Sequence, residues 1–254
     1  MRVVLITGAA QGVGYATAKL FAEKQYHVVM TDLQLLDAQI DTLSALGGSV
    51  SGLSGDISSE AFVTELAEKV SREHTAVDVL VNNAGISLIC RAEDTSFDQW
   101  QHVMNINLTG PFLLCREIGK QMLARRRGNI VNVASIAGLQ GVIDRSAYNA
   151  SKHGLIGLTR TLAAEWGSRG VRVNAVCPGW IKTEMDEADQ GSGAYSDTDI
   201  INRVPMGRFA KPEDVARAIA FLAHHDSFIN GVSLPVDGGW VADASWDDLR
   251  LKKR

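Results

Sequence analysis

The sequence predicts an α/β fold: a doubly wound parallel sheet of seven strands with helices on both faces (a Rossmann fold), in a single domain over residues 1–254. Short apolar runs alternate with longer stretches at helical spacing, which is the pattern of a parallel sheet connected by helices. The runs are continuously rich in Val, Ile and Leu, as strands buried on both faces require. No linker, repeat or low-complexity segment divides the chain.

The first half of the chain contains four expected strands: apolar runs at 3–6, 27–30 and 77–81, and a stretch at 49–54 that alternates like a strand. The intervening stretches repeat apolar residues every three or four positions, which predicts helices at 15–24, 35–46 and 60–74. Gly47 and Gly48 would end the second helix, because glycine readily adopts the left-handed conformation found there.

In the second half, a long helix is expected from Phe97 to Arg126 and another helix at 147–167. Strands are expected at 129–133, 171–176 and 232–236. Another helix begins after Lys211, with Pro212 in the first turn, where its missing N–H costs nothing. Residues 182–206 lack clear periodicity and are predicted to be an irregular substrate loop. Residues 242–254 form a polar tail with a basic end.

Composition excludes several classes of function. The formal charge is -4, from 25 basic and 29 acidic residues, so no basic field predicts nucleic-acid binding. No apolar run reaches the ~20 residues that span a bilayer. Three distant cysteines favour neither disulfides nor a metal site, and the early strand pattern leaves no room for a signal peptide. We therefore expect a cytoplasmic protein without metal, nucleic-acid or membrane partners.

A glycine-rich loop follows the first expected strand and precedes a helix: Thr7-Gly8-Ala9-Ala10-Gln11-Gly12-Val13-Gly14. Glycines let the backbone approach a ligand closely, and the helix N-terminus offers free N–H groups to phosphate. The spacing alone would also suit a structural turn. Its position between strand and helix favours a dinucleotide pyrophosphate site.

Asp32 ends the second expected strand, where a carboxylate can accept both ribose hydroxyls of adenosine and would repel a 2′-phosphate. Gln11 stands where a basic residue could receive that phosphate, so NAD is favoured over NADP. The alternative for Asp32 is a strand-end cap. Asp56 and Ile57 follow the third strand and could contact adenine, whereas Asn82 could equally be structural.

Tyr148 and Lys152 are four residues apart on an expected helix and so share a face. A Tyr can take a proton from an alcohol only when its pKa falls from ~10 toward neutrality, and nearby positive charge has that effect. Ser135 ends the fifth expected strand and could orient a substrate oxygen. Asn107 is a poor residue for a helix interior, which suggests a purpose such as bending the helix or holding a water.

Together these motifs resemble the short-chain dehydrogenase/reductase family over Val3 to Gly239, with Pro178-Gly179 and Asp237-Gly238-Gly239 as further matches. The resemblance implies a catalytic tetrad of Asn107, Ser135, Tyr148 and Lys152, with Tyr148 as general acid/base. It implies homotetramers as the common assembly. It also implies cofactor contacts from Gly8, Gln11, Gly12, Val13, Gly14, Asp32, Asp56, Ile57, Asn83, Ala84, Gly85, Tyr148, Lys152, Pro178, Gly179, Ile181 and Thr183.

These observations predict an NAD-dependent oxidoreductase acting on a secondary alcohol or ketone, such as a sugar, polyol or related hydroxy compound. Two alternatives remain: a 3-oxoacyl thioester reductase, against which Asp32 argues because it disfavours NADPH, and a nucleotide-binding protein without turnover. Substrate contacts are expected from Ser135, Gln140, Val142, Tyr148 and Trp180. Further pocket walls are expected at Ser87, Leu88, Ile89, Ile136 and the 182–206 segment.

Overall fold

A computed structural model of the protein describes residues 1–74, 76–191, 195–246 and 249–250. Its parallel sheet of seven strands has the order β3-β2-β1-β4-β5-β6-β7. The strands are β1 Val3–Thr7, β2 His27–Asp32, β3 Ser49–Ser54, β4 Val79–Asn82, β5 Gly128–Val133, β6 Val171–Pro178 and β7 Ser233–Val236. The predicted doubly wound fold is therefore confirmed.

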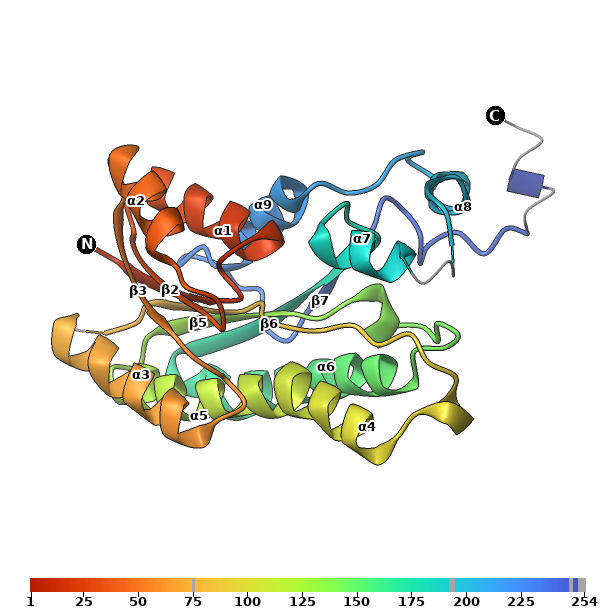
Figure 1. Ribbon diagram of the computed structural model, residues 1–254. Coiled ribbons are helices and arrows are strands. Elements are labelled where there is room, and N and C mark those ends of the chain that lie inside the picture. Colours follow the sequence, from red (N-terminus) through yellow and green to blue (C-terminus); the bar gives the residue numbers. More distant parts are fainter. Residues whose placement is uncertain (75, 192–194, 247–248, 251–254) are drawn as a thin grey trace.

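Helices cover both faces of the sheet, as Figure 1 shows. One face carries α1 (Gly12–Glu23), α2 (Asp37–Ala45) and α9 (Pro212–Leu222). The other carries α3 (Glu60–Glu73), α4 (Phe97–Met104), α5 (Gly110–Ala124) and α6 (Ser146–Trp166). No helix in the described ranges is both long enough and apolar enough to span a membrane.

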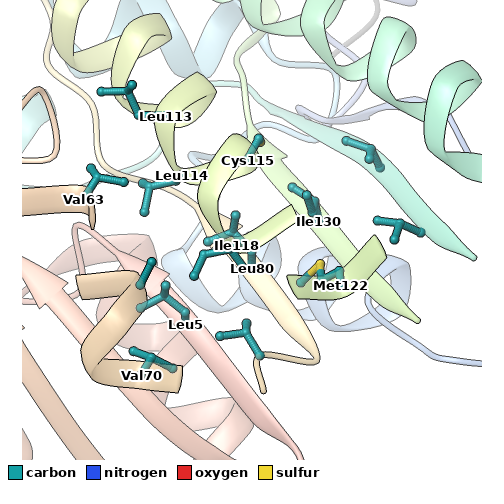
Figure 2. Close-up of a cluster of buried hydrophobic side chains, with 14 of the residues drawn as sticks. Leu5, Val63, Val70, Leu80, Leu113, Leu114, Cys115, Ile118, Met122 and Ile130 are labelled. Carbon is teal, nitrogen blue, oxygen red and sulfur yellow. The ribbon is translucent and has the colours of Figure 1, made fainter. Parts of the chain in front are cut away.

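A hydrophobic layer fills the space between the sheet and each set of helices. Figure 2 shows the layer that joins β1, β4 and β5 to α3 and α5, in which Leu5, Leu80, Leu114 and Ile118 are fully buried. In the second layer, strand residues whose side chains lie on the opposite face of the sheet, such as Ile6 and Val81, pack against α1 and α9. Burial on both faces explains why β1, with the sequence Val-Val-Leu-Ile-Thr, is almost entirely apolar.

The long helix expected over 97–126 is interrupted. A π-helical turn, Asn105–Thr109, separates α4 from α5 and contains Asn107. Single π-turns inside helices widen the backbone ladder by one residue and occur often at functional sites. The prediction of helix was right, but the periodicity carried no sign of the extra residue.

The segment predicted to be irregular contains two short helices, α7 (Glu184–Gln190) and α8 (Asp197–Arg203). Ser196 and Asp199 form a capping box that starts α8. Hydrogen bonds also hold the described part of the polar tail. The Asp243 carboxylate accepts one from Arg250 at 2.8 Å, and the Asp243 carbonyl accepts one from Arg203 at 3.0 Å. Residues 247–248 and 251–254 of this tail lie outside the described residues.

Candidate active site

A cavity of about 620 Å³ opens where the strands end at their carboxyl edge. Strand order reverses between β1 and β4, and open parallel sheets bind ligands in the crevice at such a switch point. Residues predicted to bind the cofactor make up much of its wall: Gly8, Gln11, Gly12, Val13, Asp32, Asp56, Ile57, Asn83, Ala84, Gly85, Tyr148, Lys152, Pro178, Gly179, Ile181 and Thr183.

The glycine loop combines left-handed glycines with an uncapped helix N-terminus. Gly8 and Gly12 have φ of 62° and 54°, a region that side chains disfavour. Helix α1 begins at Gly12 with no side-chain cap at Gln11, so its first N–H groups remain available to an anion. These features fit a dinucleotide phosphate.

Gly14 lies outside the cavity lining and has a packing role instead. A Cβ added there would lie 1.9 Å from the carbonyl oxygen of Gly8. The helix can therefore approach the loop only because residue 14 has no side chain. The predicted direct contact between Gly14 and the cofactor stays a prediction.

Hydrogen bonds between side chains and backbone hold the loop after β4 against the end of β1 and the glycine loop. Thr7 Oγ1 accepts the N–H groups of Asn83 and Ala84 at 3.0 and 2.9 Å. Asn83 Nδ2 donates to the carbonyls of Thr7 and Gly8, both at 3.0 Å. Asn82 points into the core and donates to Asn132 Oδ1 at 2.8 Å, which supports the structural alternative for this residue.

Asp32 combines a local capping role with a place in the cavity wall. Its carboxylate accepts hydrogen bonds from the N–H groups of Ala10 and Gln34, both at 3.0 Å. The described lining has two cationic side chains, Arg145 and Lys152, and both contact other groups. Among the described lining residues, the Asp32 end of the cavity therefore has a carboxylate and no free cation that could balance the charge of a 2′-phosphate.

Tyr148 and Lys152 share one face of α6 beside the end of β5. Lys152 Nζ lies 5.6 Å from the centroid of the Tyr148 ring and donates to the carbonyl of Val133 at 3.0 Å. Burial lowers the pKa of Lys152 to about 8. Ser135 completes the group: its hydroxyl lowers the pKa of the Tyr148 phenol, and its Oγ accepts the N–H of Ala137 at 3.1 Å.

Desolvation raises the pKa of Tyr148. The Ser135 hydroxyl and the charge of Arg145 act in the opposite direction, whereas the charge of Asp189 raises this pKa further. The phenol is therefore protonated at neutral pH, and the lowered pKa expected from the sequence stays a prediction. A lower pKa requires an additional positive charge at the site.

Asn107 acts through the backbone of a neighbouring loop and does not line the cavity. Its Oδ1 accepts the Ile86 N–H at 2.8 Å, and its Nδ2 donates to the Ile86 carbonyl at 2.9 Å and to Ser151 Oγ at 3.1 Å. A Cβ on Gly85 would lie 3.2 Å from Asn107 Oδ1 and 3.3 Å from Lys152 Nζ. The π-turn thus brings Asn107 and Lys152 to the same short stretch of backbone.

A family model described as enoyl-(acyl carrier protein) reductase matches residues 8–241. A D-threitol dehydrogenase of Mycolicibacterium smegmatis is 39% identical over 94% of this chain and 93% of its own. A 3-oxoacyl-(acyl carrier protein) reductase of Thermotoga maritima is 39% identical over 94% and 98%. The chain belongs to the short-chain dehydrogenase/reductase family.

Two further similarities place this family member among oxidoreductases. An uncharacterized short-chain type dehydrogenase/reductase of Sinorhizobium fredii is 42% identical over 95% of this chain, which spans 44% of that protein's length. The structure of a putative NAD(P)-dependent gluconate 5-dehydrogenase from Beutenbergia cavernae, described with bound NADP, has a TM-score of 0.90 and 38% identity, covering 95% of this chain and 97% of its own. The protein is therefore an oxidoreductase that acts on hydroxyl or keto groups.

The part of the cavity predicted to receive the substrate is lined by residues from several segments. Ser87, Ile136, Val142 and Trp180 line the cavity, as predicted. Met185, Asp186, Asp189 and Tyr195, all within the predicted substrate loop, line it as well. Leu88, Ile89 and the exposed Gln140 lie outside the lining, so the substrate contact of Gln140 stays a prediction.

Sequence reasoning missed Arg145, which precedes α6 and is 8% exposed. Its Nη1 donates to Ser87 Oγ at 2.6 Å and to Asp189 Oδ2 at 2.8 Å. The guanidinium carbon lies 5.5 Å from the centroid of the Trp180 ring. The one available signal was its place one helical turn before Tyr148, and that spacing is not specific.

The described residues hold no group of three His, Cys, Asp or Glu side chains arranged to bind a metal ion. Cys115 and Cys177 are buried, and burial raises their thiol pKa to about 12 and about 11. Neither thiol is ionised at neutral pH, so neither is a nucleophile.

Proposed function

We propose that the protein is an NAD-dependent oxidoreductase that transfers a hydride between nicotinamide and a secondary alcohol or ketone carbon of a sugar, polyol or related hydroxy compound. The observation that carries this proposal is the group of Ser135, Tyr148 and Lys152 at the wall of a cavity whose other end has a phosphate-binding loop. An acid/base group and a dinucleotide cradle in one cavity suit hydride transfer.

The cavity residues divide the binding of a dinucleotide between them. The Gly8–Gly14 loop and the start of α1 would hold the pyrophosphate, and Asp32 the adenosine ribose. Ile57 would pack on adenine, while Lys152 would bind the nicotinamide ribose. A bound nicotinamide would supply the hydride acceptor and a positive charge when oxidised, and the hydride donor when reduced.

The phenol of Tyr148 moves the proton in this proposal. During oxidation its oxygen takes the proton of the substrate hydroxyl, and during reduction it returns one to the carbonyl oxygen. Ser135 donates a hydrogen bond that orients the same substrate oxygen. The ammonium of Lys152 and the oxidised ring both favour the phenolate, which counters the increase in pKa that desolvation causes.

NAD is preferred over NADP because Asp32 stands at the ribose end with no cation beside it among the described residues. A 2′-phosphate would meet a carboxylate there. A structural relative with 38% identity is described with bound NADP, so the preference of this chain is a property to be measured on the chain itself. Initial rates with NAD and NADP in parallel test this preference, and higher kcat/KM with NADP would reject it.

A polyhydroxylated substrate is favoured by the polar groups at the other end of the cavity, where Asp186, Asp189, Arg145 and Ser87 offer both donors and acceptors. The similarity to a D-threitol dehydrogenase points the same way. NADH formation over a panel of sugars, polyols and simple secondary alcohols tests the substrate class. Turnover limited to simple alcohols would contradict it.

A 3-oxoacyl thioester reductase is the second candidate, because a relative with that name is 39% identical over nearly the whole chain. The basic run Arg125–Arg127 could have met an acidic carrier protein. However, Arg125 donates to the Val77 carbonyl at 2.5 Å and Arg126 to the Ser168 carbonyl at 2.9 Å. Oxidation of NADPH by a 3-oxoacyl thioester, faster than any alcohol is oxidised with NAD, would favour this candidate.

We propose a cytoplasmic homotetramer as the assembly, following the family's common state. Light scattering on a size-exclusion column measures it directly. A mass of four chains supports the proposal, and a mass of one chain overturns it. A nucleotide-binding role without turnover remains the third possibility, and its signature would be cofactor binding that is independent of any reaction.

A further inference from the structure

Arg145, Ser87 and Asp189 form a closed triangle of hydrogen bonds at the substrate end of the cavity. Arg145 Nη1 donates to both partners, at 2.6 and 2.8 Å, and Ser87 Oγ donates to Asp189 Oδ2 at 3.0 Å. Three segments meet here: the loop after β4, the residue before α6, and α7. The triangle therefore fixes the guanidinium beside the catalytic Tyr148, whose pKa it influences.

The hydrogen bonds of this guanidinium to the described residues all come from Nη1. An Arg side chain has five N–H donors, so those on Nε and Nη2 are left for another partner. Arg145 is 8% exposed and lines the cavity. We therefore infer that a substrate oxygen in the cavity could accept a hydrogen bond from Nε or Nη2.

The charges around Arg145 indicate which oxygen it would bind. Asp189 forms an ion pair with the Arg145 guanidinium, with 2.8 Å between Oδ2 and Nη1. Lys182 forms a second ion pair with Asp186, with 3.3 Å between Nζ and Oδ2. An anionic substrate group would add a second negative charge on Arg145, close to two carboxylates. A hydroxyl is neutral, accepts from the guanidinium, and can donate to a carboxylate in return. The Trp180 ring, 5.5 Å from the guanidinium carbon, adds an apolar wall.

We propose that Arg145, held by Ser87 and Asp189, is a specificity-determining residue that donates a hydrogen bond to a second hydroxyl of the substrate. The enzyme then selects molecules with a further hydroxyl beyond the reacting one over simple secondary alcohols. A site built to hydrogen-bond a hydroxyl discriminates strongly against the analogue that lacks it. This inference rests on the proposed function and specifies its substrate class.

The test compares 2,3-butanediol with 2-butanol, which differ by one hydroxyl on the same carbon chain. The measured quantity is the ratio of their kcat/KM values, because any effect of Arg145 on the pKa of Tyr148 applies to both and cancels. The variant Arg145→Met should lower this ratio roughly tenfold to a hundredfold, as expected when one hydrogen bond to a charged group is lost. The control Arg160→Met removes an exposed arginine from α6, outside the cavity lining, and should leave the ratio unchanged.

Two further variants keep the test decisive if Arg145→Met folds poorly. Arg145→Lys keeps the positive charge but loses the planar set of guanidinium N–H donors. Ser87→Ala removes a hydroxyl that positions the guanidinium. Both variants should lower the ratio of the kcat/KM values by a smaller factor than Arg145→Met does. An unchanged ratio in all three variants would overturn the proposal. So would loss of 3-hydroxybutyrate turnover in Arg145→Met with the diol ratio intact, since the guanidinium would then bind a carboxylate.

The outcome also separates this inference from the function on which it rests. If the unaltered enzyme turns over both alcohols and the ratio of their kcat/KM values is unchanged in the Arg145 variants, the specificity role alone is rejected. No turnover of any alcohol or ketone with either cofactor rejects the proposed function and the specificity role together. A ratio that falls in the Arg145 variants and stays constant in Arg160→Met supports both.

Discussion

Lys152 offers the sharpest test of how the site balances stability against function. Its ammonium is 3% exposed, and burial lowers its pKa from 10.5 to about 8. That difference corresponds to about 3 kcal/mol of unfavourable burial of the charged form, at ~1.36 kcal/mol per pH unit. Replacement by Met removes this cost. It also removes the hydrogen bond to the Val133 carbonyl, and losing that bond lowers stability by about 1–2 kcal/mol.

We therefore expect Lys152→Met to raise the free energy of unfolding by about 1–2 kcal/mol at pH 6 while abolishing turnover. The sign follows from linkage: the folded pKa lies below the unfolded pKa, so the folded state binds fewer protons between pH 8 and 10.5. The unaltered protein gains stability as pH rises through that window. The advantage of Lys152→Met is thus largest below pH 8 and shrinks toward pH 10.

Urea unfolding at fixed protein concentration, from pH 6 to pH 10, measures this difference. Lys24→Met is the matched control, because Lys24 is exposed at the end of α1 and its removal should change stability by less than about 0.5 kcal/mol at every pH. A Lys152→Met protein that is less stable than the unaltered one at pH 6, or a difference independent of pH, would refute the reasoning.

Three other substitutions test the cofactor end and the π-turn. Asp32→Ala removes the carboxylate that faces a 2′-phosphate, so the NADP to NAD ratio of kcat/KM should rise about tenfold; an unchanged ratio argues against the assigned role. Gly14→Ala places a Cβ 1.9 Å from the Gly8 carbonyl, which should weaken NADH binding in a fluorescence titration and cost about 1–3 kcal/mol of stability. Asn107→Ala breaks two hydrogen bonds to the Ile86 backbone and should cost about 2–3 kcal/mol in urea unfolding; a cost near zero would remove its structural role.

Local patterns were sufficient to predict the sheet. Strand β1 is an apolar run, Val3 to Ile6, that ends at Thr7, because both of its faces are buried. The loop from Gly8 to Gly14 was predictable as well, since its glycines serve a backbone shape that no other residue adopts easily.

Features that depend on contacts between distant segments were not predictable. The π-turn around Asn107 is stabilised by hydrogen bonds to Ile86 and Ser151, which the spacing of apolar residues does not encode. Helix α8 did carry a local signal, the Ser196 and Asp199 capping box, which was overlooked. Arg145 gave no specific signal, because its contacts depend on Asp189, which lies in another segment of the chain.

The most direct test of the central claim is NADH formation by the unaltered enzyme and by Tyr148→Phe, measured on the same polyol with cofactor binding titrated in parallel. The account predicts that Tyr148→Phe binds NADH with an affinity within about threefold of the unaltered enzyme and loses at least about a hundredfold in kcat, because the phenol that moves the proton is gone. Turnover retained in Tyr148→Phe would contradict the acid/base role, and with it the assignment of this cavity as the catalytic site.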